Sequence, residues 1–120
     1  MDINEQFIQA MRDAVAERGR DYVYPLGNPD YALHDSSCVY STPDGTPACL
    51  IGLALSKVMP EAVPEYDAPT ETADELLLPL GFSQIVADAA FAAQTVQDTE
   101  RTWGLALDVF EDVLADAATV

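Results

Sequence analysis

The chain has 120 residues, a formal net charge of −16 and an apolar content of 49%. This length is typical of one domain with one core, so we expect residues 1–120 to form a single folded unit. The acidity argues against direct binding to nucleic acid or to an anionic membrane, because both require basic protein surface.

The sequence shows no sign of export or of membrane insertion. No apolar run reaches the roughly 18 residues of a transmembrane helix, and the start of the chain lacks the basic and apolar regions of a signal peptide. We therefore expect a cytoplasmic protein. The acidity is uneven: from Val58 onward there are thirteen acids and one base, Arg101, and the first 57 residues contribute only −4.

A helix is predicted near the start of the chain. Asp2 and Glu5 have the spacing of a capping box, apolar residues follow at helical spacing, and Gly19 suits a left-handed position after the last turn. Arg12 and Arg18 lie off the apolar stripe, so we expect them to pair with nearby acids or with a neighbouring element.

Residues 20–47 combine short β-type runs with turn-forming residues. The runs are 22–24 and 38–40, and Pro43-Asp44-Gly45 is a strong turn signal. We expect a small β-hairpin or short-strand element within residues 22–49. A three-residue loop would place Cys38 and Cys49 on opposite faces, whereas a loop one residue longer would set them opposite each other. Two cysteines in a cytoplasmic protein favour reduced thiols over a disulfide.

The most apolar stretch, residues 48–55, predicts a buried central helix. We expect Thr46 as its N-cap and Pro47 as its first residue. Gly52 inside this helix is unfavourable by about 1 kcal/mol relative to alanine, so close packing against another backbone is expected there.

The remaining elements are helical. Residues 60–71 hold three prolines and four acids, and they predict an extended acidic loop that is the best candidate for mobility. Thr72 and Glu75 form a second capping box, and Gly81 ends the short helix that they open. Ser83 and Thr102 are expected to cap the last two helices. The predicted fold class is mainly α, of the α+β type: about five helices around one core with the small β element.

Cys49 is the sharpest candidate for chemistry. In a helix that begins at Pro47, its thiol lies in the first turn, where the macrodipole lowers a cysteine pKa. The only histidine, His34, with Asp35 beside it, would then be the base of a thiol-dependent enzyme. The competing interpretation, which we favour, is a small side chain buried in an apolar helix.

No residues have the spacing of a metal or cofactor site. Cys38, Cys49 and His34 supply only three zinc ligands, and Asp30 and Asp44 lack the ladder of a calcium loop. No phosphate-binding glycine-rich loop is present. We expect no metal and no cofactor.

The last predicted helix carries an acidic stripe. Asp108, Asp112 and Asp116 recur every four residues, Glu111 lies beside them, and no lysine is interleaved. Like charges at this spacing repel by a few tenths of a kcal/mol per pair. One interpretation is a solvated face. The other is an interaction surface for a basic protein, with carboxylates that imitate nucleic-acid phosphates.

Trp103 is expected to anchor the start of the last helix in the core. Three polar residues near the end of the preceding helix, Gln94, Gln97 and Asp98, are expected either to cluster with the indole or to cap backbone groups.

Several segments resemble small hypothetical proteins of actinobacterial phages. They are Cys38-Val39-Tyr40, the run from Asp44 to Leu55, and Gln97-Asp98 with Trp103-Gly104. The resemblance implies a phage accessory protein in the host cytoplasm, and it carries over no activity and no catalytic residues. Our first hypothesis is a protein that binds a basic host or phage factor. The alternatives are the thiol enzyme, a virion structural component, and acidity that only adapts the protein to salt.

Overall fold

The structure, a computed structural model, describes residues 2–33, 37–69 and 71–118. Five α-helices dominate this part of the chain: α1 (Ile3–Arg18), α2 (Leu50–Val58), α3 (Ala73–Leu77), α4 (Gln84–Asp98) and α5 (Trp103–Ala118). Three single 3₁₀ turns join them, namely η1 (Pro29–Tyr31), η2 (Pro60–Ala62) and η3 (Leu78–Leu80). The prediction of a mainly helical chain with about five helices around one core is confirmed.

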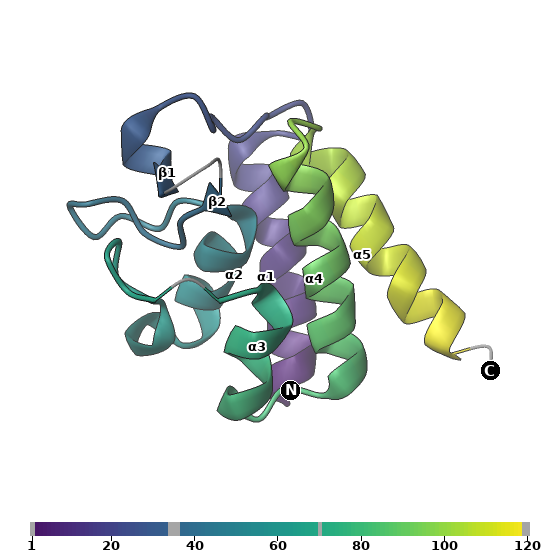
Figure 1. Cartoon of the computed structure of the whole chain (residues 1–120). Helices are drawn as coiled ribbons and strands as arrows, with labels where there is room; N and C mark the ends of the chain where they lie inside the picture. The colour runs from purple at the N-terminus through teal and green to yellow at the C-terminus, as the bar shows by residue number, and fades with distance from the viewer. Residues whose placement is uncertain (1, 34–36, 70, 119–120) are drawn as a thin grey trace.

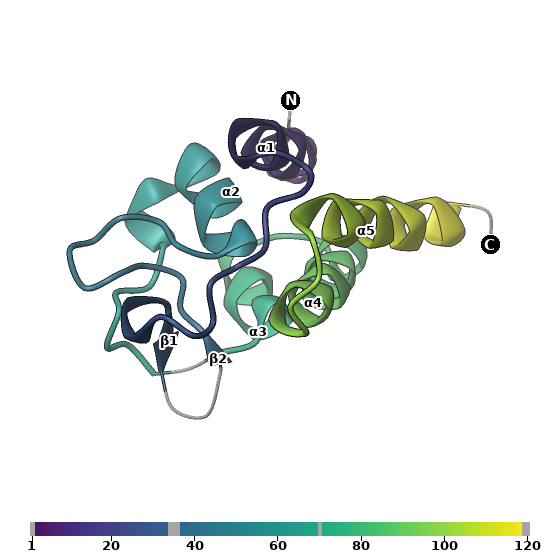
Figure 2. The same cartoon turned by 90° about the horizontal axis from the view of Figure 1, so that it is seen from above.

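The helices pack in pairs around that core. α4 and α5 form an antiparallel pair, α1 packs on α2, and α3 packs on α4 (Figure 1). In the view from above, α1 and α4 lie on either side of the start of α5, and the C-terminal end of α5 projects away from the other helices (Figure 2). One continuous cluster of buried side chains fills the space between them, with Phe7 in edge-to-face contact with Phe82 and Phe110.

Side-chain caps begin the helices where the sequence predicts them. Asp2 accepts a hydrogen bond from the backbone N–H of Glu5 at 2.8 Å, and Ser83 caps α4 in the same way. Thr102 accepts from the third residue of α5, at 3.2 Å. These bonds satisfy N–H groups that have no partner within the helix. Gly19 and Gly81 follow helical segments with φ of +97° and +99°, which non-glycine residues rarely adopt.

The start of α2 differs from the prediction. Its N-cap is Cys49 and its first residue is Leu50, so the expected N-cap at Thr46 and first residue at Pro47 were wrong. The reason is tertiary. Residues 46–49 are held by the preceding segment, with hydrogen bonds from Ala48 N–H to the Tyr40 carbonyl and from Cys49 N–H to the Val39 carbonyl. Helical backbone cannot form until this pairing ends.

The β structure is very small. Strand β1 (Ala32–Leu33) pairs antiparallel with β2 (Ser37–Cys38), and the residues between them lie outside the described part of the chain. The predicted run 22–24 does not pair with 38–40, because Val23 instead forms an isolated bridge with Thr102. The Tyr24 hydroxyl joins the two segments: it accepts from Val39 N–H at 3.2 Å and donates to the Tyr31 carbonyl at 2.5 Å.

Gly52 is the point where this irregular segment rests on α2. A Cβ atom at Gly52 would lie 2.3 Å from the Tyr40 carbonyl oxygen, which is far inside van der Waals contact. The predicted close packing against another backbone is therefore confirmed. The turn at 43–45 lies beside the segment that follows α2, and residues of both line one cleft.

Candidate functional site

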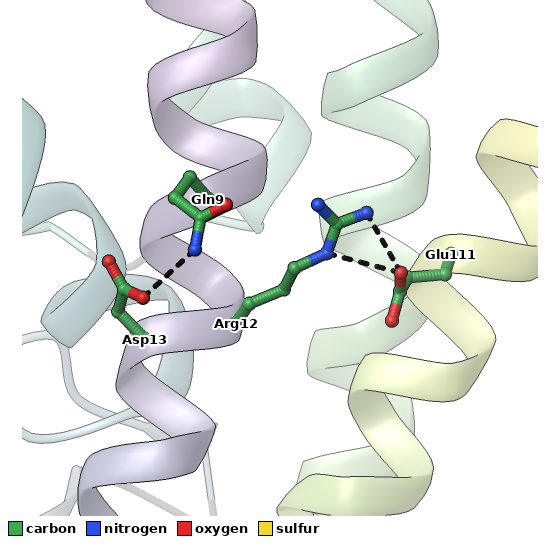
Figure 3. Close-up of polar contacts among 4 residues, drawn as sticks. All are labelled: Gln9, Arg12, Asp13 and Glu111. Carbon is green, nitrogen blue, oxygen red and sulfur yellow. Dashed lines mark hydrogen bonds and ion pairs between the residues drawn. The ribbon is translucent and has the colours of Figure 1, made fainter.

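The acidic stripe of α5 is partly neutralised within the molecule. Arg12 reaches across from α1 and donates from Nε and Nη2 to Glu111 Oε2, at 3.2 and 3.0 Å (Figure 3). Arg20 Nη2 lies 2.7 Å from Asp108 Oδ2, and this hydrogen bond and the carboxylate charge raise the pKa of Arg20. Asp108 and its neighbour Glu111 are therefore ion-paired within the molecule, with arginines from other segments.

The outer carboxylates of the stripe lie farther along α5. Asp112 and Asp116 are both exposed, and Asp112 has no partner among the described residues. They belong to the half of the helix that projects from the molecule (Figure 1). This exposed end of the stripe stays a candidate interaction surface.

The other two bases among the first 57 residues, Arg18 and Lys57, also have partners within the chain. Lys57 Nζ forms an ion pair with Glu17 at 3.1 Å. The Arg18 guanidinium lies over the rings of Tyr22 and Trp103, 5.3 and 5.8 Å from their centroids, in cation–π geometry. Positive charge is thus concentrated around α1 and is bound internally.

A second acidic region is formed by two segments that are distant in the sequence. The turn at residues 41–45 and the segment from Pro60 to Asp67 enclose a cleft of about 670 Å³. Three of its lining residues are the exposed acids Asp44, Glu65 and Asp67. Residues 60–71 stand out in the sequence as acidic and rich in proline, but their contact with a turn some twenty residues earlier is a tertiary feature that no local pattern indicates.

Asp44 is held rigidly at the rim of this cleft. Its Oδ1 accepts hydrogen bonds from the Thr42 hydroxyl and from Thr46 N–H. Both bonds favour the ionised carboxylate, so they lower the pKa of Asp44, with the Thr42 hydroxyl as the larger cause. Asp44 therefore keeps its negative charge over a wider pH range than an isolated aspartate.

The predicted pairing of Cys49 with His34 lies partly outside the described residues. Cys49 is a free thiol with 0% exposure, and its Sγ accepts from Gly52 N–H at 3.3 Å as the N-cap of α2. His34 and the neighbouring Asp35 lie outside the described residues, as does the side chain of Cys38. The buried thiol fits a structural cap, because a nucleophile must be reached by its substrate.

The polar residues of α4 cap backbone groups. Gln97 Oε1 accepts from the N–H of Leu50, the first residue of α2, at 2.8 Å. Gln94 Oε1 accepts from the N–H of Ala73, the first residue of α3, also at 2.8 Å. Asp98 accepts from the Gln97 amide. Of the two roles considered for this group, capping is the one observed.

Trp103 occupies the core at the start of α5, as predicted. It is fully buried, and its ring meets Tyr22 edge-on at a centroid distance of 4.7 Å. The indole N–H has no hydrogen-bond partner among the described residues.

Comparisons of the chain with protein-family models, with curated proteins and with solved structures find no match. Within the described residues, no group of three or more histidine, cysteine or acidic side chains is arranged to hold a metal ion. In the same part of the chain, no helix combines the length and apolar character needed to cross a membrane.

Proposed function

We propose that this protein is an acidic interaction protein that binds a basic protein partner and has no catalytic step of its own. In the setting that the phage resemblance implies, the partner is a basic host or phage factor. The proposal extends to a partner that otherwise binds nucleic acid, whose basic surface the carboxylates would occupy.

The observation that carries the proposal is that most bases of the chain already form ion pairs with its own carboxylates. Arg12, Arg20 and Lys57 are already in ion pairs with carboxylates of the same chain. Residues 58–100 hold nine acids and no base. The negative charge of this segment is therefore not offset by any base within it. Such an excess of charge would speed encounter with a positively charged surface.

Affinity capture tests the proposal. The immobilised protein is exposed to bacterial lysate at about 0.1 M salt, where charges still interact over roughly 10 Å, and again at about 1 M salt, where that range falls to roughly 3 Å. We expect basic proteins to be retained at the lower salt and released at the higher. A purified captured protein should then lose a labelled DNA duplex when this protein is added, measured by fluorescence anisotropy.

Two results would contradict the proposal. Retention of no basic protein at about 0.1 M salt removes the partner altogether. Retention that survives molar salt points to an apolar interface instead of a charged one. A partner that keeps its DNA when saturated with this protein would leave the interaction standing but remove the imitation of nucleic acid.

A virion component remains the alternative for a phage protein. Assembly requires a self-complementary face or a repeating contact between copies, and a net charge of −16 opposes contact between copies of this chain. We expect a monomer by size-exclusion chromatography with light scattering at about 0.1 M salt. A defined higher oligomer would favour the alternative.

A further inference from the structure

The cleft between the turn at 41–45 and the segment 60–67 is built differently from the rest of the acidic surface. Its volume, about 670 Å³, falls within the range of small-molecule and peptide pockets. Pro43, Pro60 and Val63 provide apolar lining, and Tyr66 adds an aromatic ring. The cleft therefore offers contact area as well as charge.

Ser41 is the unusual residue of this cleft. Ser41 lines the cleft and is only 5% exposed. Its hydroxyl has no hydrogen-bond partner among the described residues. Among the described residues, the fully buried side-chain polar atoms without a partner include only the Trp103 indole nitrogen, so the Ser41 oxygen keeps some contact with solvent at the cleft. The neighbouring Thr42 hydroxyl, by contrast, is used internally by Asp44. The free hydroxyl of Ser41 is a hydrogen-bonding group available to a bound molecule.

The charged residues of the cleft come from two separate segments. Asp44 lies on the turn, and Glu65 and Asp67 lie on the segment after α2. None of the three carboxylates is in an ion pair with a described base. A ligand held here meets acceptors from both walls, with a rigid carboxylate on one of them.

We propose that this cleft binds an arginine side chain of a basic peptide segment, which names the point of contact within the proposed function and rests on it. A guanidinium has five N–H donors in a planar fork, so a single side chain can donate to more than one acceptor of the cleft, the Ser41 oxygen among them. The apolar stem of the arginine and its neighbouring residues then contact the prolines and Tyr66.

Peptide titration tests the assignment. The probe is an acetylated and amidated tri-arginine peptide, and the reference probe is the tri-lysine peptide of equal charge. Titration of ¹⁵N-labelled protein at about 0.05 M salt should shift the amide signals of residues 41–45 and 60–67. We expect tri-arginine to bind at least threefold more tightly than tri-lysine, because a lysine ammonium is a point donor with three N–H groups.

Two double variants, each of which removes two carboxylates, distinguish binding in the cleft from nonspecific electrostatic attraction to the acidic surface. Glu65→Gln/Asp67→Asn should weaken tri-arginine binding at least tenfold. Asp112→Asn/Asp116→Asn, which removes two carboxylates from the projecting end of α5, should weaken it less than threefold. Equal losses in the two double variants would overturn the proposal, as would equal affinity for the two peptides.

Ser41→Ala leaves the net charge unchanged, so its effect on peptide binding does not arise from electrostatic attraction. The hydroxyl makes no internal hydrogen bond among the described residues, so we expect the thermal midpoint to be unchanged or slightly raised. We also expect tri-arginine binding to fall at least threefold while tri-lysine binding changes less. Unchanged tri-arginine binding in a folded Ser41→Ala variant would remove this residue, and with it the arginine assignment.

The captured partner distinguishes the failure of this proposal from the failure of the proposed function. If the partner binds the Glu65→Gln/Asp67→Asn variant as tightly as the wild type but not the α5 variant, the cleft proposal fails and the interaction function stands. If the wild type retains no basic partner while tri-arginine still occupies the cleft, the function fails and the site stands.

Discussion

Gly52 has no side chain, and this allows α2 to contact the backbone of the segment before it. The Tyr40 carbonyl lies where the Cβ atom of residue 52 would be, at 2.3 Å, so no side chain fits there without a shift of backbone. We predict that Gly52→Ala lowers the free energy of unfolding by about 1–3 kcal/mol through overpacking, although alanine is the better helix former. Urea denaturation followed by Trp103 fluorescence measures the change.

Gly27→Ala is the matched control for this substitution. A Cβ atom at Gly27 would meet nothing within 4 Å, and its φ is not in the left-handed region. We expect its midpoint to stay within the error of the wild type. Equal destabilisation of both variants would show that the close approach to Tyr40 has no energetic consequence.

Cys49 gives the second prediction at the scale of a single residue. Because its side chain is fully buried and its Sγ accepts from Gly52 N–H, iodoacetamide should not alkylate it in the folded protein. Peptide mass mapping should find Cys49 labelled only after denaturant is added. Rapid labelling of Cys49 in native buffer would restore the hypothesis of a thiol-dependent enzyme.

At the scale of elements, α4 organises the two short helices beside it. Gln97 and Gln94 accept from the first N–H groups of α2 and α3, which are buried and have no other partner in their own helices. We predict that Gln97→Met, which keeps the length of the side chain, lowers the free energy of unfolding by about 1–3 kcal/mol because it leaves the Leu50 N–H unpaired. Chemical denaturation measures this loss. Gln84→Met, at an exposed position of the same helix, should change it little.

The start of α3 gives a prediction that depends on pH. Glu75 accepts from Thr72 N–H at 3.0 Å, and this bond holds the pKa of Glu75 below its ordinary value of 4.5. The lowered pKa in the folded state means that its stabilising contribution is present above the unfolded value and is lost as the pH falls through the folded pKa. Glu75→Ala should therefore lower the thermal midpoint at pH 7, with a difference that shrinks below pH 4.5.

Glu61→Ala removes the same charge without removing a cap, because the Glu61 carboxylate has no hydrogen-bond or ion-pair partner among the described residues. It should leave the midpoint at pH 7 unchanged or raise it, since it only relieves repulsion. A constant difference between Glu75→Ala and the wild type from pH 7 to pH 3 would contradict the role of the ionised carboxylate.

The helices were predictable from the sequence because their signals are local. Four of the helices begin after a capping residue that the sequence shows directly: Asp2, Thr72, Ser83 and Thr102. The apolar spacing of each helix likewise depends only on residues within that helix. The start of α2 was not predictable in this way. Thr46-Pro47 is a good local helix start, but pairing of residues 46–49 with 39–42 outweighs it.

The site was predictable only in part, for the same reason. The acids of α5 could be read from their spacing, but the arginines that neutralise Asp108 and Glu111 come from positions 88 and 99 residues away in the chain. The cleft likewise needs two segments that are distant in the sequence. Charge content is a property of the sequence, whereas the pairing of charges is a property of the fold.

At the scale of the whole molecule, self-repulsion should control how stability responds to salt. A net charge of −16 opposes compaction, and the three ion pairs found among the described residues are exposed enough to contribute little against it. Sodium chloride should therefore raise the thermal midpoint. Most of the rise should occur below about 0.5 M, because the screening length has already fallen to roughly 3 Å at 1 M.

The shape of this salt curve separates two explanations of the acidity. Screening alone gives a rise that levels off, and it is compatible with a surface that meets a basic partner at moderate salt. Adaptation to a saline interior gives stability that continues to climb steeply beyond 1 M, and it needs no partner. A scan of the midpoint from about 0.05 to 3 M sodium chloride distinguishes them. We expect the curve to level off, because the nine acids between residues 58 and 100 gain nothing more once their mutual repulsion is screened.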